Sequence, residues 1–143
     1  MNLSPHFTLA EFVVSDTAAR RGIENDPPAD LLHALKRTAQ GMEAVRVRLG
    51  GAPIIISSGY RCPALNAAVG GQPSSQHTRG EAADFIAPRF GSPTEVAAAL
   101  RDSVVDYDQL ILEFGRWVHI SFSQAPRHQA LVIDARGTRP MFG

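Results

Sequence analysis

The chain has 143 residues, of which 44% are hydrophobic and 20% are charged, and its 14 basic residues balance its 14 acidic ones. This length suits one globular domain with a single core, and the neutral balance gives no bulk attraction to nucleic acid or to an anionic membrane surface. No apolar run is long enough for membrane insertion, and a single cysteine, Cys62, excludes an internal disulfide. The N-terminal stretch lacks the pattern of a secretory signal peptide, so we expect synthesis in the cytoplasm.

The first half of the chain carries helix patterns. Thr8 begins a capping box that predicts a helix to about Arg20. From Asp30 the apolar residues recur at helical spacing as far as Leu49, where two glycines follow, and this predicts one long helix. Residues 62–71 have a proline near the start and glycines after the end, which predicts a short helix.

Strand patterns begin at residue 53 and are most frequent late in the chain. Residues 53–57 form a β-branched run between chain breakers and predict a buried strand, and residues 81–86 predict another. Between these and the last strands, Ser92 opens a second capping box. Three further runs are typical of a β-meander: 107–114, 117–122 and 130–134. Helices first and strands late favour a single α+β domain, with an antiparallel sheet and helices packed on one face. We expect the terminal stretches MNLSPH and RGTRPMFG to be loosely held.

A histidine in the predicted strand 117–122 faces away from the core. Side chains alternate along a strand, so Val118 and Ile120 point to one face and His119 shares the other with Trp117. A functional site on the surface of a sheet has this pattern. The alternative is an exposed strand histidine with no special role.

An aspartate in the strand 81–86 needs an explanation. Asp84 lies among apolar residues, and a buried carboxylate must be compensated. A divalent cation would do so, and so would a salt bridge to Arg61 or Arg79. His77 lies seven residues before Asp84. With the strand histidine, these residues would supply two imidazoles and one carboxylate, a donor set that suits a catalytic zinc ion with one open position.

The stretch SSQHTRGEAADF matches the pattern Ser-x-His-x-x-Gly-x-Ala-x-Asp. SGYRCPALNAAVGG precedes it and WVHIS follows it. Together they resemble the M15 peptidases, which include zinc D-Ala-D-Ala carboxypeptidases and dipeptidases, phage L-Ala-D-Glu endolysins, and the related hedgehog signalling domain. The resemblance covers about residues 53–122 of a single domain expected over 1–143. The upstream segment FTLAEFVVSDTAARRGIEN resembles the small phage and prophage branch.

The resemblance implies a hedgehog/D,D-peptidase-like α+β fold and one zinc ion, whose ligands would be His77, Asp84 and His119. It also implies that Ser75 contacts substrate and that Arg61 binds a substrate carboxylate or stabilises the oxyanion on the scissile carbonyl. We expect Tyr60, Gln76 and Trp117 to line the cleft.

Peptide hydrolysis at such a site needs a base that deprotonates the attacking water and passes the proton to the leaving amine. Several family members place a carboxylate three residues before the last histidine, where this chain has Arg116. Hedgehog-like members place a glutamate six residues before it, and here that residue is Glu113. A three-residue hairpin turn would pair Glu113 with Trp117 on the face of the last histidine, whereas a shorter turn would point it at the core. Asp106 and Asp108 are the alternatives.

These features predict a zinc peptidase that cuts peptide stems of bacterial peptidoglycan, as a D,D-carboxypeptidase or an L-Ala-D-Glu endopeptidase. We expect a monomer without nucleic-acid partners. The missing signal fits a phage or prophage lysis enzyme that reaches the cell wall through a holin or in a virion. One alternative is a zinc-containing binding module without turnover, as in hedgehog. The other is a structural domain in which the three side chains do not converge.

Overall fold

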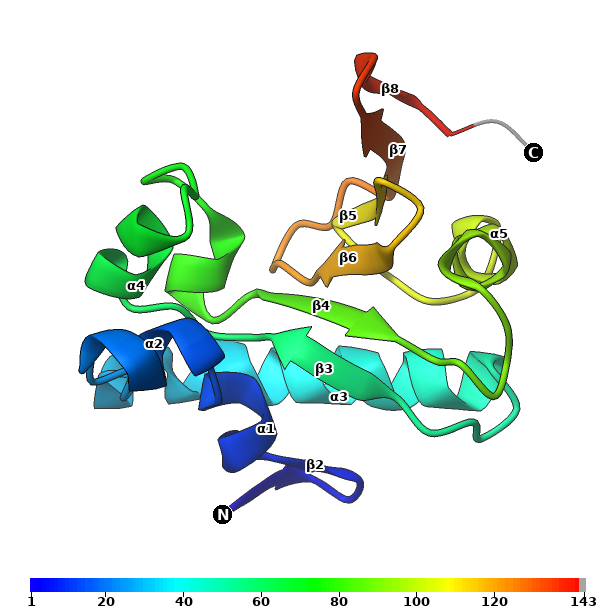
Figure 1. Cartoon of the computed structure of the whole chain (residues 1–143). Coiled ribbons are helices and arrows are strands. Elements are labelled where there is room, and N and C mark those ends of the chain that lie inside the picture. The colour runs from blue at the N-terminus through cyan, green and yellow to red at the C-terminus, as the bar shows by residue number, and fades with distance from the viewer. Residues whose placement is uncertain (142–143) are drawn as a thin grey trace.

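The polypeptide folds around one six-stranded sheet with the strand order β3-β4-β6-β5-β7-β8 (Figure 1). This computed structural model describes residues 1–141. The strands are β1 (Asn2–Ser4), β2 (Phe7–Thr8), β3 (Ile55–Ser58), β4 (Ala82–Ile86), β5 (Gln109–Glu113), β6 (Trp117–Ser121), β7 (Gln129–Asp134) and β8 (Gly137–Pro140). The helices are α1 (Leu9–Val13), α2 (Asp16–Arg21), α3 (Leu32–Arg48), α4 (Pro63–Ala68) and α5 (Pro93–Arg101), with 3-10 helices η1 (Ala29–Leu31) and η2 (Gln76–Arg79). The predicted α+β class is confirmed.

Side-chain caps explain where the first helices begin and end. Thr8 forms the predicted capping box, and its hydroxyl accepts from the backbone N–H of Glu11. The single helix expected to reach Arg20 is in fact two helices. Val14 is extended, and the Ser15 hydroxyl caps a new helix by accepting from the backbone N–H of Ala18. The expectation failed because Ser15 competes for the backbone in the middle of an otherwise continuous pattern.

The long helix α3 and the helix α5 cover the core face of the sheet, as expected. Of the α3 residues predicted from helical spacing, Leu32 is partly buried and the other four are fully buried: Leu35, Ala39, Met42 and Val45. Alternate residues of the sheet join them in one cluster, namely Ala83, Phe85, Leu110, Val118 and Ile120. Helix α5 adds Val96, Ala97 and Leu100. The other face of the central strands is therefore the one that is free to carry polar chemistry. Within residues 1–141, no helix combines the length and apolar character needed to cross a membrane.

The predicted β-meander is wrong in one connection. Strands β5 and β6 form the expected antiparallel hairpin, but β7 crosses to the far side of β5 and pairs with it in parallel. It then turns back on β8 in the antiparallel hairpin that projects from the rest of the fold in Figure 1. The other pairings in the sheet are antiparallel, as predicted.

Two further expectations need correction. Strand β3 was predicted to be buried, but it forms an edge of the sheet and Ile55 is 52% exposed. The termini were expected to be loosely held, yet the first residues pair as β1 and β2, and Arg139 of β8 forms a salt bridge with Asp134 at 2.8 Å. The last two residues of RGTRPMFG lie outside the described range.

Candidate metal centre

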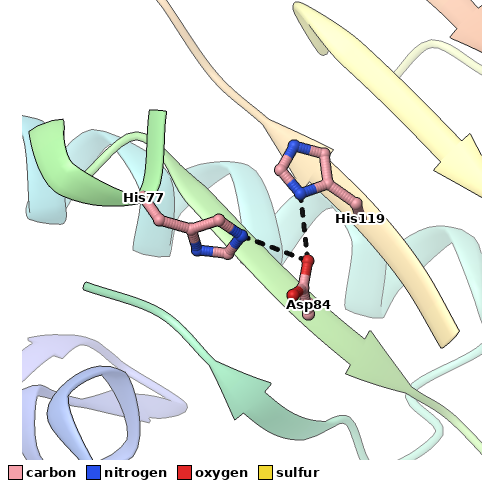
Figure 2. Close-up of side chains that lie close together, drawn as sticks. All are labelled: His77, Asp84 and His119. Carbon is pink, nitrogen blue, oxygen red and sulfur yellow. Dashed lines mark hydrogen bonds and ion pairs between the residues drawn. The ribbon is translucent and has the colours of Figure 1, made fainter. Parts of the chain in front are cut away.

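Three side chains from separate elements converge on the polar face of the sheet. His77 comes from η2, Asp84 from β4 and His119 from β6 (Figure 2). Each offers one ligand atom, these atoms all lie within 4.8 Å of one another, and all three residues are buried. The Asp84 Oδ1 atom lies 3.3 Å from His77 Nε2 and 2.9 Å from His119 Nδ1. The alternative of a domain in which these residues stay apart is thereby excluded.

Local hydrogen bonds fix the orientation of His77. Ser75 is the N-cap of η2 and its hydroxyl accepts from the His77 backbone N–H. The His77 Nδ1 atom lies 2.7 Å from the carbonyl oxygen of Gly59. A carbonyl can only accept, so this contact places a proton on Nδ1; Nε2, which faces Asp84, carries a lone pair when the ring is neutral and donates to the carboxylate when the ring is protonated.

Sheet register places Asp84 beside His119. The two residues are direct partners in the antiparallel pairing of β4 with β6. Burial works to raise the pKa of Asp84, but hydrogen bonds and charge from His119 and His77 outweigh it and hold that pKa well below its usual range. The carboxylate is therefore ionised and ready to act as a ligand throughout the neutral range.

The donor set fits a single zinc ion. Ligand atoms about 2.0–2.1 Å from a tetrahedral ion lie roughly 3.3 Å apart, close to the Asp84–histidine distances in the structure. Two imidazoles and one carboxylate leave a fourth position for water or substrate. With Gly59 holding the outer nitrogen of His77, one ligand already has its supporting contact.

Glu113 lies on the same face as this cluster. The hairpin turn has three residues, so Glu113 pairs with Trp117, and Ile111 pairs with His119. Phe114 and Gly115 adopt positive φ angles to make that turn. Burial, and then the negative charge of Asp84, raise the pKa of Glu113. The charge of a protonated His119 opposes part of that rise. The Trp117 indole Nε1 is buried and has no hydrogen-bond partner within residues 1–141.

Comparison with known protein families matches residues 5–121 to the Peptidase M15 family. The match covers most of the chain and includes the whole His-Asp-His cluster. The chain belongs to the M15 peptidase family. M15 peptidases are metal-dependent, which agrees with the geometry of the cluster. A search of curated proteins gave no match.

Arg61, to which the M15 resemblance gives a substrate role, lies against the cluster. Its Nη2 is 3.5 Å from Asp84 Oδ2, while Nε donates to Ser58 and Nη1 donates to the side chain of Asn66. The salt bridge considered as an alternative to a metal is thus present, but it is long. It involves Oδ2, so Asp84 Oδ1 is left to the histidines.

The other M15-based assignments fall in different places. Ser75 lines a cavity of about 390 Å³ beside His119, together with Gln76. Trp117 lines a separate cavity of about 740 Å³ at the β5–β6 turn. Tyr60 belongs to the hydrophobic cluster and is 4% exposed, so its side chain offers almost no surface to a substrate.

Alternative bases are poorly placed in this M15 domain. Arg116 is exposed in the hairpin turn. Asp106 is exposed, whereas Asp108 is buried and its carboxylate accepts from Arg127 and Gln76. These hydrogen bonds hold the pKa of Asp108 at about 2. No local pattern could have revealed this contact, because its partners come from three distant segments.

Proposed function

We propose that this chain is a zinc metallopeptidase that hydrolyses peptide stems of bacterial peptidoglycan. The observation that carries the proposal is the buried His77–Asp84–His119 cluster in a chain of the M15 family, with Glu113 on the same face of the sheet. When bound there, zinc would polarise the scissile carbonyl and activate water for attack.

Glu113 supplies the proton transfers. Its position on the face of His119 lets it take the proton from the attacking water and give it to the leaving amine. A pKa raised by burial brings this carboxylate closer to neutrality, where a group that both accepts and returns a proton works best. The β5–β6 hairpin register therefore supports the base role.

Arg61 and Ser75 support the substrate. Ser58 and Asn66 hold the Arg61 guanidinium beside the cluster, so its positive charge is positioned to stabilise charge that develops on the scissile carbonyl. Ser75 lines the cavity next to His119 and offers a hydroxyl to the peptide.

The proposal covers two bonds and one biological setting. A D,D-carboxypeptidase would remove a terminal D-Ala, whereas an L-Ala-D-Glu endopeptidase would cut nearer the glycan. The setting is a monomeric phage or prophage lysis enzyme that acts on the wall after release. The resemblance to the small phage and prophage branch supports that setting.

The test is mass spectrometry of purified peptidoglycan digested with the zinc-loaded protein and with Glu113→Gln. Loss of the base should slow cleavage by about 10²–10⁴-fold, with the zinc content unchanged. Glu24→Gln is the matched control, because Glu24 is exposed and lies outside the site. The masses of the released fragments identify the bond. A wild-type protein that binds zinc but releases nothing from several wall types would instead be a binding module of the hedgehog kind.

A further inference from the structure

The cavity beside His119 is lined mainly by basic and neutral polar residues and by no acidic residue. It lies between the loop that carries η2 and strand β5, and its volume is about 390 Å³. Two of its lining residues are arginines, Arg79 and Arg127. Serine hydroxyls and glutamine amides, including those of Ser75 and Gln76, make up most of the remaining polar wall.

Arg79 is held in place and only partly neutralised. Its Nε donates to Glu81 at 3.0 Å and its Nη1 donates to the Ser74 carbonyl at 2.8 Å. The other carboxylate oxygen of Glu81 accepts from Arg37 at 3.2 Å. Two guanidinium groups therefore share one carboxylate, and this part of the surface keeps a net positive charge. Glu81 is largely covered, whereas half of the Arg79 side chain is exposed.

The buried carboxylate of Asp108 holds Arg127 in place. Asp108 is 2% exposed, and it accepts from the Arg127 backbone N–H, Nε and Nη2 at 2.8–2.9 Å. Gln76 donates to the same carboxylate. The Arg127 side chain is 57% exposed and lines the cavity, whereas Asp108 does not line it. A guanidinium fixed in this way loses little conformational freedom when it binds a ligand.

We propose that this cavity is a carboxylate subsite, in which Arg79 and Arg127 bind a free carboxylate of the stem peptide beside the bond that is cut. The inference rests on the proposed function and adds a selectivity to it. Stem peptides carry carboxylates on D-glutamate and at the C-terminus, and amidation removes their charge. The enzyme should therefore prefer a stem whose carboxylate is free at the position that enters this cavity.

The experiment measures binding apart from turnover. Zinc-loaded Glu113→Gln protein is titrated by calorimetry with the peptide L-Ala-γ-D-Glu-L-Lys-D-Ala-D-Ala and with two monoamides, one amidated on D-glutamate and one at the C-terminus. One of the monoamides should bind about tenfold more weakly than the acid. Adding Arg79→Gln or Arg127→Gln should weaken binding of the acid by a similar factor and reduce its advantage over that amide.

Matched variants guard against misfolding. Arg136→Gln removes the same charge from an exposed turn outside the cavity and should change nothing. Arg127→Lys keeps a positive charge next to Asp108. The comparison of the acid peptide with its amides uses protein in which both arginines are intact, so it does not depend on the folding of an arginine variant.

The outcomes separate the two proposals. Equal binding of acid and amides, no measurable binding of the acid, or insensitivity to both arginine substitutions would overturn the carboxylate subsite, whether or not the wild type cleaves peptidoglycan. Arginine-dependent preference for the acid would support the subsite. If the wild type then cleaved nothing, the peptidase proposal alone would fail.

Discussion

Asp108→Asn should lower the free energy of unfolding by about 2 kcal/mol at pH 7. Contacts with Arg127 and Gln76 hold the pKa of this buried carboxyl at about 2 instead of the ordinary 3.8. A difference of that size corresponds to about 2 kcal/mol. An asparagine amide would also turn a donor toward the guanidinium, which adds to the loss. For a chain of this size the melting temperature should fall by roughly 5–10 °C.

Urea unfolding across pH is the assay, with Asp106→Asn as the matched control, because Asp106 is exposed two residues away. Since the native pKa is depressed, the stabilisation is fully present well above about pH 4 and is lost as the pH falls toward about 2. The difference between wild type and variant should therefore be constant from about pH 8 to pH 5 and shrink below that range.

Asp108→Asn should also weaken zinc binding at the metal centre. Gln76 and His77 are neighbours in η2, so releasing Gln76 from Asp108 loosens the segment that positions one ligand. Zinc affinity, measured by competition with a chelator, should weaken by up to about tenfold. If Asp108→Asn unfolds and binds zinc like Asp106→Asn, then the buried carboxylate neither stabilises the fold nor supports the site.

Further outcomes concern the metal, Glu113 and Gly41. Chelation should abolish peptidase activity and added zinc should restore it, and zinc at about 100 times its Kd should raise the free energy of unfolding by about 2.7 kcal/mol; a chelator-resistant activity would contradict the metal role. Because the base must be ionised, the acid limb of kcat/KM should follow the ionisation of Glu113 and should vanish in Glu113→Gln. The metal-free protein should lose stability as the pH rises through the raised pKa of Glu113, because the native state holds that proton more tightly than the unfolded chain. Gly41→Ala should cost about 1–2 kcal/mol in urea unfolding despite the better helix propensity of alanine, because its Cβ would overlap the Phe122 ring, and an unchanged midpoint would show that the ring moves aside freely.

Features of the fold that depend on near neighbours were predictable from the sequence. Both capping boxes, the long helix and the central strands follow from patterns within a few residues. The pairing of β7 with β5 was not predictable, because a strand pattern in the sequence does not specify which strand it pairs with. The edge position of β3 was missed for the same reason, since the three consecutive isoleucines at 54–56 suit a buried strand equally well.

The candidate site divides along the same line. The M15 motif and a strand histidine were enough to predict that His77, Asp84 and His119 would meet. The hairpin register was left open between two turn lengths, and the structure has the three-residue turn. The contacts that hold them were not predictable. Neither the Gly59 carbonyl behind His77 nor the Arg127–Asp108 pair belongs to any short pattern. Burial of Tyr60 was equally hidden, because its neighbours in the core come from remote segments.

The direct pairing of Asp84 with His119 has a consequence for refolding. These two residues are 35 apart in sequence and face each other across β4 and β6. A slip of one residue in that pairing would turn one of them toward the core. High-affinity zinc uptake should therefore be a late event in refolding, because it must wait for a long-range strand pairing that is slow to close. The time course of zinc binding, followed with a zinc-sensitive dye during refolding, would then report when β4 and β6 pair in the correct register. Circular dichroism of helices that form early would not detect that step.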